Sequence, residues 1–193
     1  MTISKIKLGT LFSISIIILN VAMAIETPKH TLVKKENGFE IRQYDSMIIA
    51  KTKVRSDYSD AASTGFRRIA SYIFGGNSAN MSIKMTAPVL TNSPDPKDNY
   101  EIQFVMPSEH SMEDLPQPNS QNVTLKKVNL GKTAVLRFGG WATEERASKY
   151  KNKLRDLLVA NGYAANGIFM VAQYNSPWAI PPFRKNEIIV QVK

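Results

Sequence analysis

Histidine, cysteine and carboxylate side chains are the usual metal ligands and proton-transfer groups in proteins. This sequence of 193 residues contains two histidines, His30 and His110, and no cysteine. The histidines are far apart in the chain, and neither forms a metal-ligand pattern with neighbouring carboxylates. The acidic pairs at 113–114 and 144–145 are typical of a loop and of a helix start. We therefore predict no catalytic residue and no metal ligand.

The sequence also lacks the common motifs of nucleophilic, phosphate and zinc sites. It has no Gly-x-Ser-x-Gly turn, no phosphate-binding glycine loop and no His-Glu-x-x-His pattern. The glycine pairs at 75–76 and 139–140 are better interpreted as a helix end and a strand break. A protein that binds rather than transforms its ligand is therefore favoured. An enzyme acting on an unknown exported substrate is kept as an alternative.

Large apolar side chains stand beside positive charge in the proline-rich segment 177–185. Trp178, Ile180 and Phe183 lie there, and Arg184 and a lysine follow them. Bulky apolar groups in a loop commonly close over a pocket or line one. We expect these residues to contact a flat apolar ligand, and the basic residues to pair with its acidic groups. A loop that simply packs on the core is the alternative.

A helix is expected to form the other side of this groove. Ala62, Phe66, Ile69 and Ile73 recur at spacings of four, three and four, which place them on one helical face. The glycines at 75–76 end this pattern. The two segments together give our predicted ligand-binding residues: Phe66, Arg67, Ala70, Ile73, Trp178, Ile180, Phe183 and Arg184.

The elements that must position these residues occur twice in the order strand, helix, strand, strand. Two such units can pair their sheets into one curved, mostly antiparallel sheet or open barrel, with both helices packed on it, which predicts an α+β fold. Residues 25–37 are expected to be a loose lead-in to this fold. The first unit is predicted at 39–54, 56–74, 81–90 and 100–106, and the second at 123–138 with a turn at Gly131, 143–161, 168–174 and 187–192.

The apolar stretch at 81–90 is predicted to be an alternating strand. Ile83, Met85, Ala87 and Val89 would share its buried face. Pro88 lacks the N–H that a ladder requires, so the strand should lie at an edge or break at that position.

The first 24 residues have the pattern of a secretory signal peptide. Lys5 and Lys7 precede an apolar run at 8–21, and Ala22 and Ala24 form a small-x-small cleavage pattern. The run is shorter than the roughly 20 residues that span a bilayer. We therefore expect an exported protein, periplasmic or secreted, with one domain at 25–193 and no membrane segment in the mature chain.

The net charge of +9 favours acidic partners. Its basic residues are scattered, which is typical of a solvated surface rather than of one nucleic-acid-binding face. We expect no nucleic-acid partner and a monomer. A basic module acting at an anionic membrane surface is a further alternative.

Six segments, in order, resemble markers of the SOUL haem-binding protein family. Together they extend from about residue 32 to 192. They are Phe39-Glu-Ile-Arg-Gln-Tyr44, Gly65-Phe66 with Tyr72-Ile-Phe-Gly-Gly-Asn77, Lys84-Met-Thr-Ala-Pro-Val89, Phe138-Gly-Gly-Trp-Ala142, Tyr174-Asn-Ser-Pro177 and Asn186-Glu-Ile188.

This resemblance implies a fold of two similar halves, in which a distorted, mostly antiparallel barrel-like sheet is flanked by two long helices. It also implies the binding of haem or a related tetrapyrrole, without established catalysis. It places the ligand in a shallow apolar groove between the first helix and the turn before the last strand. Where members carry basic residues that face the propionates, this sequence has Ser63, Ser71 and Ile180. Gln43 occupies the position of a histidine that some members carry.

Overall fold

The computed structural model describes residues 25–92, 99–176 and 179–193. The predicted signal peptide and Trp178 therefore lie outside the described residues. In chain order the elements are β1 (His30–Lys35), β2 (Glu40–Arg55), α1 (Tyr58–Ile73), β3 (Val89–Asn92), β4 (Asn99–Val105), β5 (Thr124–Phe138), α2 (Glu144–Ala160), β6 (Met170–Gln173), the short 3-10 helix η1 (Pro181–Phe183) and β7 (Asn186–Gln191).

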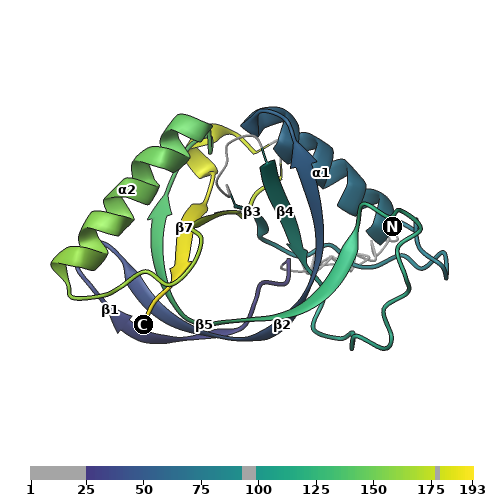
Figure 1. Cartoon of the computed structure of the whole chain (residues 1–193), viewed down its shortest axis with the longest axis horizontal. Coiled ribbons are helices and arrows are strands. Elements are labelled where there is room, and N and C mark those ends of the chain that lie inside the picture. The colour runs from purple at the N-terminus through teal and green to yellow at the C-terminus, as the bar shows by residue number, and fades with distance from the viewer. Residues whose placement is uncertain (1–24, 93–98, 177–178) are drawn as a thin grey trace, which may run out of the picture.

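Six antiparallel strands close into a barrel, and β1 is added outside it. The order around the sheet is β1-β2-β4-β3-β6-β7-β5, and β2 also pairs with β5 to close the ring. The units β2-α1-β3-β4 and β5-α2-β6-β7 repeat the predicted order. The α+β fold of two similar halves with two long helices is thus confirmed (Figure 1).

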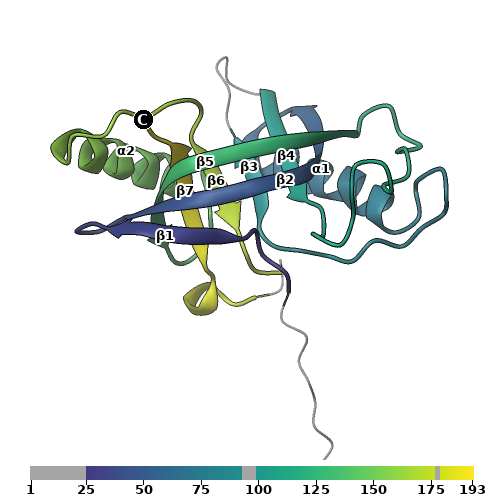
Figure 2. The ribbon, with the colours of Figure 1, turned by 90° about the horizontal axis from the view of Figure 1, so that it is seen from below.

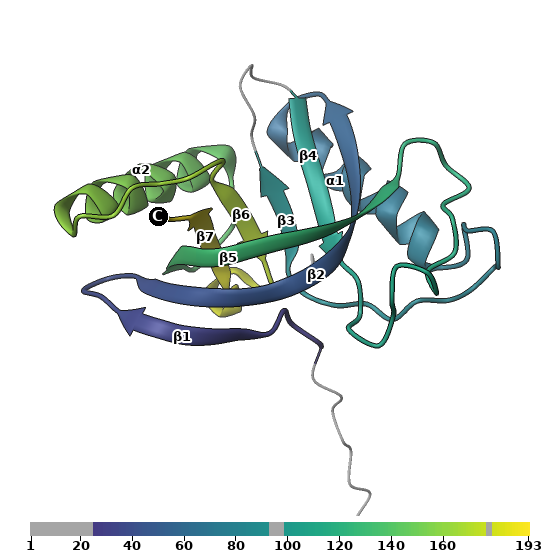
Figure 3. The same ribbon diagram turned by 60° about the horizontal axis from the view of Figure 1, so that its bottom comes forward.

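The long strands β2 and β5 run side by side across the width of the molecule (Figures 2 and 3). At one end the ribbon supports α2, because Ile41 and Ala134 pair there and belong to the core under that helix. At the other end Ala50 and Leu125 pair and belong to the core under α1. One ribbon therefore links the cores of the two halves.

Both helices begin at a side-chain cap. Asp57 accepts a hydrogen bond from the Asp60 N–H at 2.9 Å, and Thr143 accepts one from the Arg146 N–H at 3.3 Å. Such caps satisfy N–H groups that the first turn leaves without an intrahelical partner. The N-terminal ends of α1 and α2 point toward each other over the barrel (Figure 1). No helix of the described chain is long and apolar enough to cross a bilayer.

The buried face of α1 differs from the predicted one. Ala61 and Gly65 are buried, whereas Ala62 and Phe66 are partly exposed. The absence of a side chain at Gly65 makes this possible, since a Cβ there would lie 2.5 Å from Ile102 Cγ1. The helix thus lies close on β4, and Phe66 is turned away from the core.

Three local predictions are wrong. The expected lead-in contains β1, which pairs with β2. The expected strand at 81–90 begins only at Val89, because Pro88 interrupts the ladder and the backbone before it bonds elsewhere, as in the Ala87 N–H to Glu26 bond of 2.8 Å. Its predicted buried face also fails at Met85, which is 44% exposed. The expected turn at Gly131 lies within β5, where the strand continues at a φ of +55°.

A buried salt-bridge cluster joins β2 of the first half to β7 of the second. Arg42 donates to both carboxylate oxygens of Glu187, at 3.0 and 3.1 Å, and also to Glu40. Tyr174 donates to Glu187 at 2.6 Å. Because Glu187 is fully buried, these bonds replace the water that its charge would otherwise need.

Candidate functional site

A cavity of about 850 Å³ lies between the N-terminal ends of the two helices. Its floor is the seam between β3 and β6, where Val89 pairs with Gln173 and both line the cavity. One wall is α1, and the other is the segment that leads into α2. The lining residues are Asp57, Tyr58, Ser59, Ala62, Ser63, Phe66, Arg67, Val89, Thr91, Trp141, Ala142, Thr143, Glu144, Gln173, Asn175 and Arg184.

The α1 wall combines an apolar surface with a cation. Ala62 and Phe66 lie one turn apart, so both face the cavity. Arg67 follows on the exposed side and donates to Thr64 at 3.1 Å. This wall can cover one face of an apolar ligand and place a positive charge at its edge.

The opposite wall is built by the strand break at the end of β5. Gly140 adopts a φ of +80°, a conformation that glycine accommodates without strain. Its carbonyl accepts from the Asn186 side chain at 2.8 Å, and the Gly139 carbonyl accepts from Arg146 at 2.8 Å. These bonds fix the segment that presents Trp141, which is 50% exposed, to the cavity.

Charges of both signs surround the cavity. Arg67 and Arg184 are its cations, and Asp57 and Glu144 are its acids. The two acids sit at the helix starts, where the positive ends of the helix dipoles favour them. Glu144 also accepts from the Tyr100 hydroxyl at 3.3 Å. Arg67, which is exposed, and Arg184, which is buried, are therefore the cations that an acidic ligand in the cavity would meet.

The structure brings together part of the predicted site. Phe66, Arg67 and Arg184 line the cavity. Ala70 and Ile73 lie farther along α1, beside a small void of about 10 Å³ that Phe66 also borders. Ile180 and Phe183 are 59% and 74% exposed and line none of the described cavities. Trp178 lies outside the described residues.

Several lining residues were not anticipated from the sequence. Trp141 was available as a signal, since it directly follows the glycines that break β5. Tyr58 and Thr91 gave none, because a tyrosine at a helix start and a threonine in a strand are ordinary. Ser63, which occupies the position of a basic residue in the family that the sequence resembles, lines the cavity. Gln43 instead is exposed on β2, away from it.

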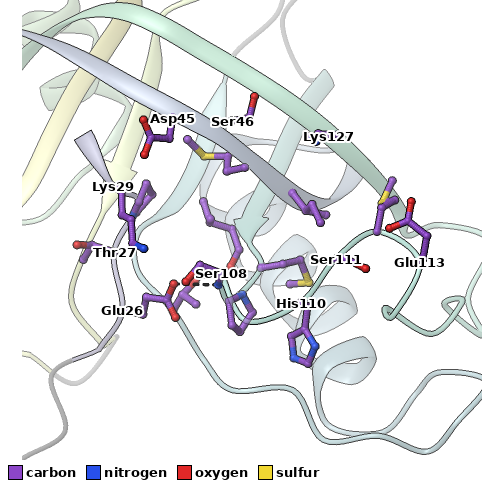
Figure 4. Close-up of a pocket in the computed structure, with 18 residues that line it drawn as sticks. Glu26, Thr27, Lys29, Asp45, Ser46, Ser108, His110, Ser111, Glu113 and Lys127 are labelled. Carbon is purple, nitrogen blue, oxygen red and sulfur yellow. Dashed lines mark hydrogen bonds between the residues drawn. The ribbon is translucent and has the colours of Figure 1, made fainter. Parts of the chain in front are cut away.

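A second cavity, of about 420 Å³, lies between the chain before β1, the middle of β2 and the loop after β4. Figure 4 shows its charged and polar residues spread around it, with Glu26 and Lys29 from the chain before β1, Asp45 from β2, and His110 and Glu113 from the loop. None of the seven predicted binding residues that the structure describes lines it. Over the described ranges, no three histidine or acidic side chains gather closely enough to hold a metal ion.

A closed duplicated barrel with a cavity between its two helices defines the architectural class of this protein. Residues 25–191 match the family described as SOUL heme-binding protein. The match covers most of the sequence, and the chain belongs to the SOUL family.

Two proteins with sequences similar to this chain are mammalian. Heme-binding protein 2 of Homo sapiens is 30% identical over 167 residues, which cover 81% of each chain. Heme-binding protein 2 of Mus musculus is 31% identical over 158 residues, which cover 78% of this chain and 76% of the relative. A crystal structure described as a hydrolase from Listeria innocua superposes with a TM-score of 0.59 at 12% identity, covering 83% of this chain and 94% of its own. At that identity the similarity shows the fold alone.

Proposed function

We propose that this protein is an exported, non-enzymatic binding protein that takes haem, a related tetrapyrrole or another flat amphiphilic ligand between its two helices. The observation that carries this proposal is the 850 Å³ cavity with an apolar wall on α1 and Trp141 opposite. Its volume lies within the ~300–1,000 Å³ range of small-molecule sites. The names of the two mammalian relatives support haem as the first ligand to test.

The cavity lining suits a flat aromatic body. Phe66 and Ala62 cover one side, Trp141 covers the other, and Val89 contributes to the floor. Burial of apolar surface would supply most of the affinity, at ~25 cal/mol per Å². A ring that lies between Phe66 and Trp141 would leave its edges at the polar ends of the cavity.

Acidic substituents of the ligand would meet the two arginines. Arg67 is exposed at the α1 rim, and Arg184 lies across the cavity near Trp141. Arginine binds carboxylates through two parallel hydrogen bonds, which fixes the orientation of the acid. Propionate-like groups are therefore expected beside these two arginines.

The residues present fit a tetrapyrrole ring better than they fit its iron. Among the described residues that line the cavity, none is a histidine, methionine or cysteine, the usual protein ligands of haem iron. We infer that affinity comes from the ring and its acids, without ligation of iron by a lining histidine, methionine or cysteine.

A titration of the purified protein with protohaem, followed at the Soret band, tests this function. The expected result is a saturable spectral shift at micromolar ligand. The absence of saturation would exclude haem and leave other flat amphiphiles, which a displacement assay with a fluorescent aromatic probe would then test. N-terminal sequencing of the protein from the producing cells tests export, with Ile25 expected as the first residue of the mature chain.

A further inference from the structure

Two buried hydroxyl groups beside the cavity lack a hydrogen-bond partner in the described part of the chain. They are Tyr58 Oη, on the first residue of α1, and Thr91 Oγ1, on β3. Tyr58 is 9% exposed and Thr91 is 1% exposed. A buried hydroxyl without a partner destabilises the fold, because folding removes the hydrogen bonds that it makes with water. Local costs of this kind are typical of functional sites.

The two hydroxyls belong to residues in one wall. Tyr58, Thr91 and Glu144 line the cavity between the helices and also a neighbouring cavity of about 290 Å³. They therefore separate the two spaces. Each hydroxyl can reorient its O–H donor by rotation about its own C–O bond.

The surroundings of this wall determine what it can bind. The Tyr58 ring packs edge-on against Tyr100, with centroids 5.6 Å apart, and the Tyr100 hydroxyl donates to Glu144. An acidic substituent here would lie against the Glu144 carboxylate and be repelled. Burial raises the pKa of Tyr58 above its ordinary value of 10.0, so its hydroxyl stays protonated and can donate.

We propose that Tyr58 and Thr91 bind a neutral hydrogen-bonding group of the ligand, such as a lactam, an amide or a hydroxyl. This inference rests on the proposed function, because it assumes a flat ligand in the cavity between the helices. It also gives that ligand an orientation. Its acidic groups would lie at the arginines, and a neutral polar group would lie at the wall formed by Tyr58 and Thr91.

Among tetrapyrroles, this chemistry favours linear ones. A linear tetrapyrrole ends in lactams, each with a carbonyl acceptor and an N–H donor. The edge of mesoporphyrin that lies opposite its propionates carries only alkyl groups, which would leave both hydroxyls without a partner. Both classes carry propionates that suit Arg67 and Arg184.

The test compares Tyr58→Phe and Thr91→Val in the full chain, with biliverdin and mesoporphyrin as probes. Each substitution should weaken biliverdin binding about three- to tenfold, as expected for one lost hydrogen bond. Mesoporphyrin affinity should change less than twofold. The ligand-free variants should unfold at the wild-type temperature or above it, since neither hydroxyl has a hydrogen-bond partner among the described residues.

Two satisfied hydroxyls provide matched controls. Tyr72 donates to the Pro116 carbonyl at 3.0 Å, and Thr86 donates to the Val105 carbonyl. Tyr72→Phe and Thr86→Val should therefore lower the unfolding temperature and leave both ligand affinities unchanged. Neither residue lines the cavity between the helices.

The outcomes separate this inference from the function on which it rests. Equal biliverdin affinity in wild type, Tyr58→Phe and Thr91→Val overturns the inference, and so does binding of mesoporphyrin without biliverdin. Variants that unfold at lower temperature with unchanged affinity also overturn it, because the hydroxyls would then be structural. A wild-type protein that binds neither probe nor protohaem overturns the proposed tetrapyrrole function and this inference with it.

Discussion

The Arg184 guanidinium lies 3.6 Å from the centre of the Trp141 ring. This contact joins the loop before β7 to the segment before α2, and both residues line the cavity. Arg184 also donates from Nε to the Ala179 carbonyl at 2.8 Å, which holds the guanidinium in place. Stacking on an aromatic face contributes about 0.5–2 kcal/mol, and more where water is excluded.

Substitution Trp141→Ala should weaken protohaem binding about tenfold. The change removes one wall of the cavity and the ring that orients Arg184. Because Trp141 is half-exposed, the free energy of unfolding should fall by less than about 1 kcal/mol. Soret titration and urea unfolding measure the two effects.

Phe183→Ala is the matched control, since Phe183 is a large exposed aromatic that lies outside the cavity. Its protohaem affinity should equal that of wild type. If Phe183→Ala weakened binding and Trp141→Ala did not, the ligand would lie against the loop favoured by sequence reasoning.

Iron should contribute little to affinity. The described lining offers no histidine, methionine or cysteine, and burial raises the pKa of its tyrosine, Tyr58, which disfavours the phenolate that would ligate iron. Protoporphyrin and protohaem should therefore bind within about threefold of each other. Fluorescence quenching and absorbance titration measure the two dissociation constants. A preference for protohaem above about a hundredfold, with a low-spin spectrum, would show that a protein group ligates the iron.

Gly65→Ala should destabilise the protein by about 1–3 kcal/mol despite the better helix propensity of alanine. The added Cβ would come within 2.5–2.7 Å of three Ile102 side-chain atoms. Urea unfolding measures the change. In a double-mutant cycle with Ile102→Ala, the two effects should fall short of their sum, because truncating Ile102 opens space for the new methyl group. Additive effects would show that the strain arises elsewhere.

Ionisation of Glu187 should make the stability of the fold depend on pH in the acidic range. Burial opposes its ionisation, but hydrogen bonds from Arg42 and Tyr174 outweigh burial and hold its pKa below the ordinary 4.5. The pKa is thus lower in the folded chain than in the unfolded chain. The ionised carboxylate therefore stabilises the fold above about pH 4.5, and this contribution is lost as the pH falls through the folded pKa.

Glu187→Gln should accordingly lower stability by about 3 kcal/mol near neutrality, since it removes the fully buried one of the two carboxylates that bind Arg42. In thermal unfolding from pH 7 to 3, the difference in stability between wild type and Glu187→Gln should become smaller below about pH 4.5. Glu109→Gln is the control, because the Lys84–Glu109 pair is largely exposed and contributes little. A stability difference that stays constant across this pH range would show that the substitution acts through packing alone.

Local patterns were sufficient to predict the duplicated fold. The caps Asp57 and Thr143 and the alternation along β4 depend on near neighbours, and they mark elements that the structure contains. Met85 and β1 depend on distant partners instead. Alternation places Met85 in the core, but the interrupted ladder at Pro88 leaves it exposed, and β1 forms because β2 offers it an edge.

The cavity was harder to predict because it depends on how closely α1 approaches the sheet. Phe66 was predicted to bind the ligand and to share a buried helical face with Ile69. It lines the cavity but is only partly buried, because Gly65 allows a different face of the helix to contact Ile102. Trp141 reaches the same space through the second half of the chain. The periodicity of one helix or strand does not show which residues of the other half will lie beside it.

Closure of the barrel through β2 and β5 has a consequence for synthesis. One edge of the 16-residue β2 has no partner until β5, in the second half of the chain, has been made. A long unpaired strand is a template for pairing between chains. Slow translation between these strands would therefore promote aggregation, and chaperones that cover strand edges should raise the yield of folded protein.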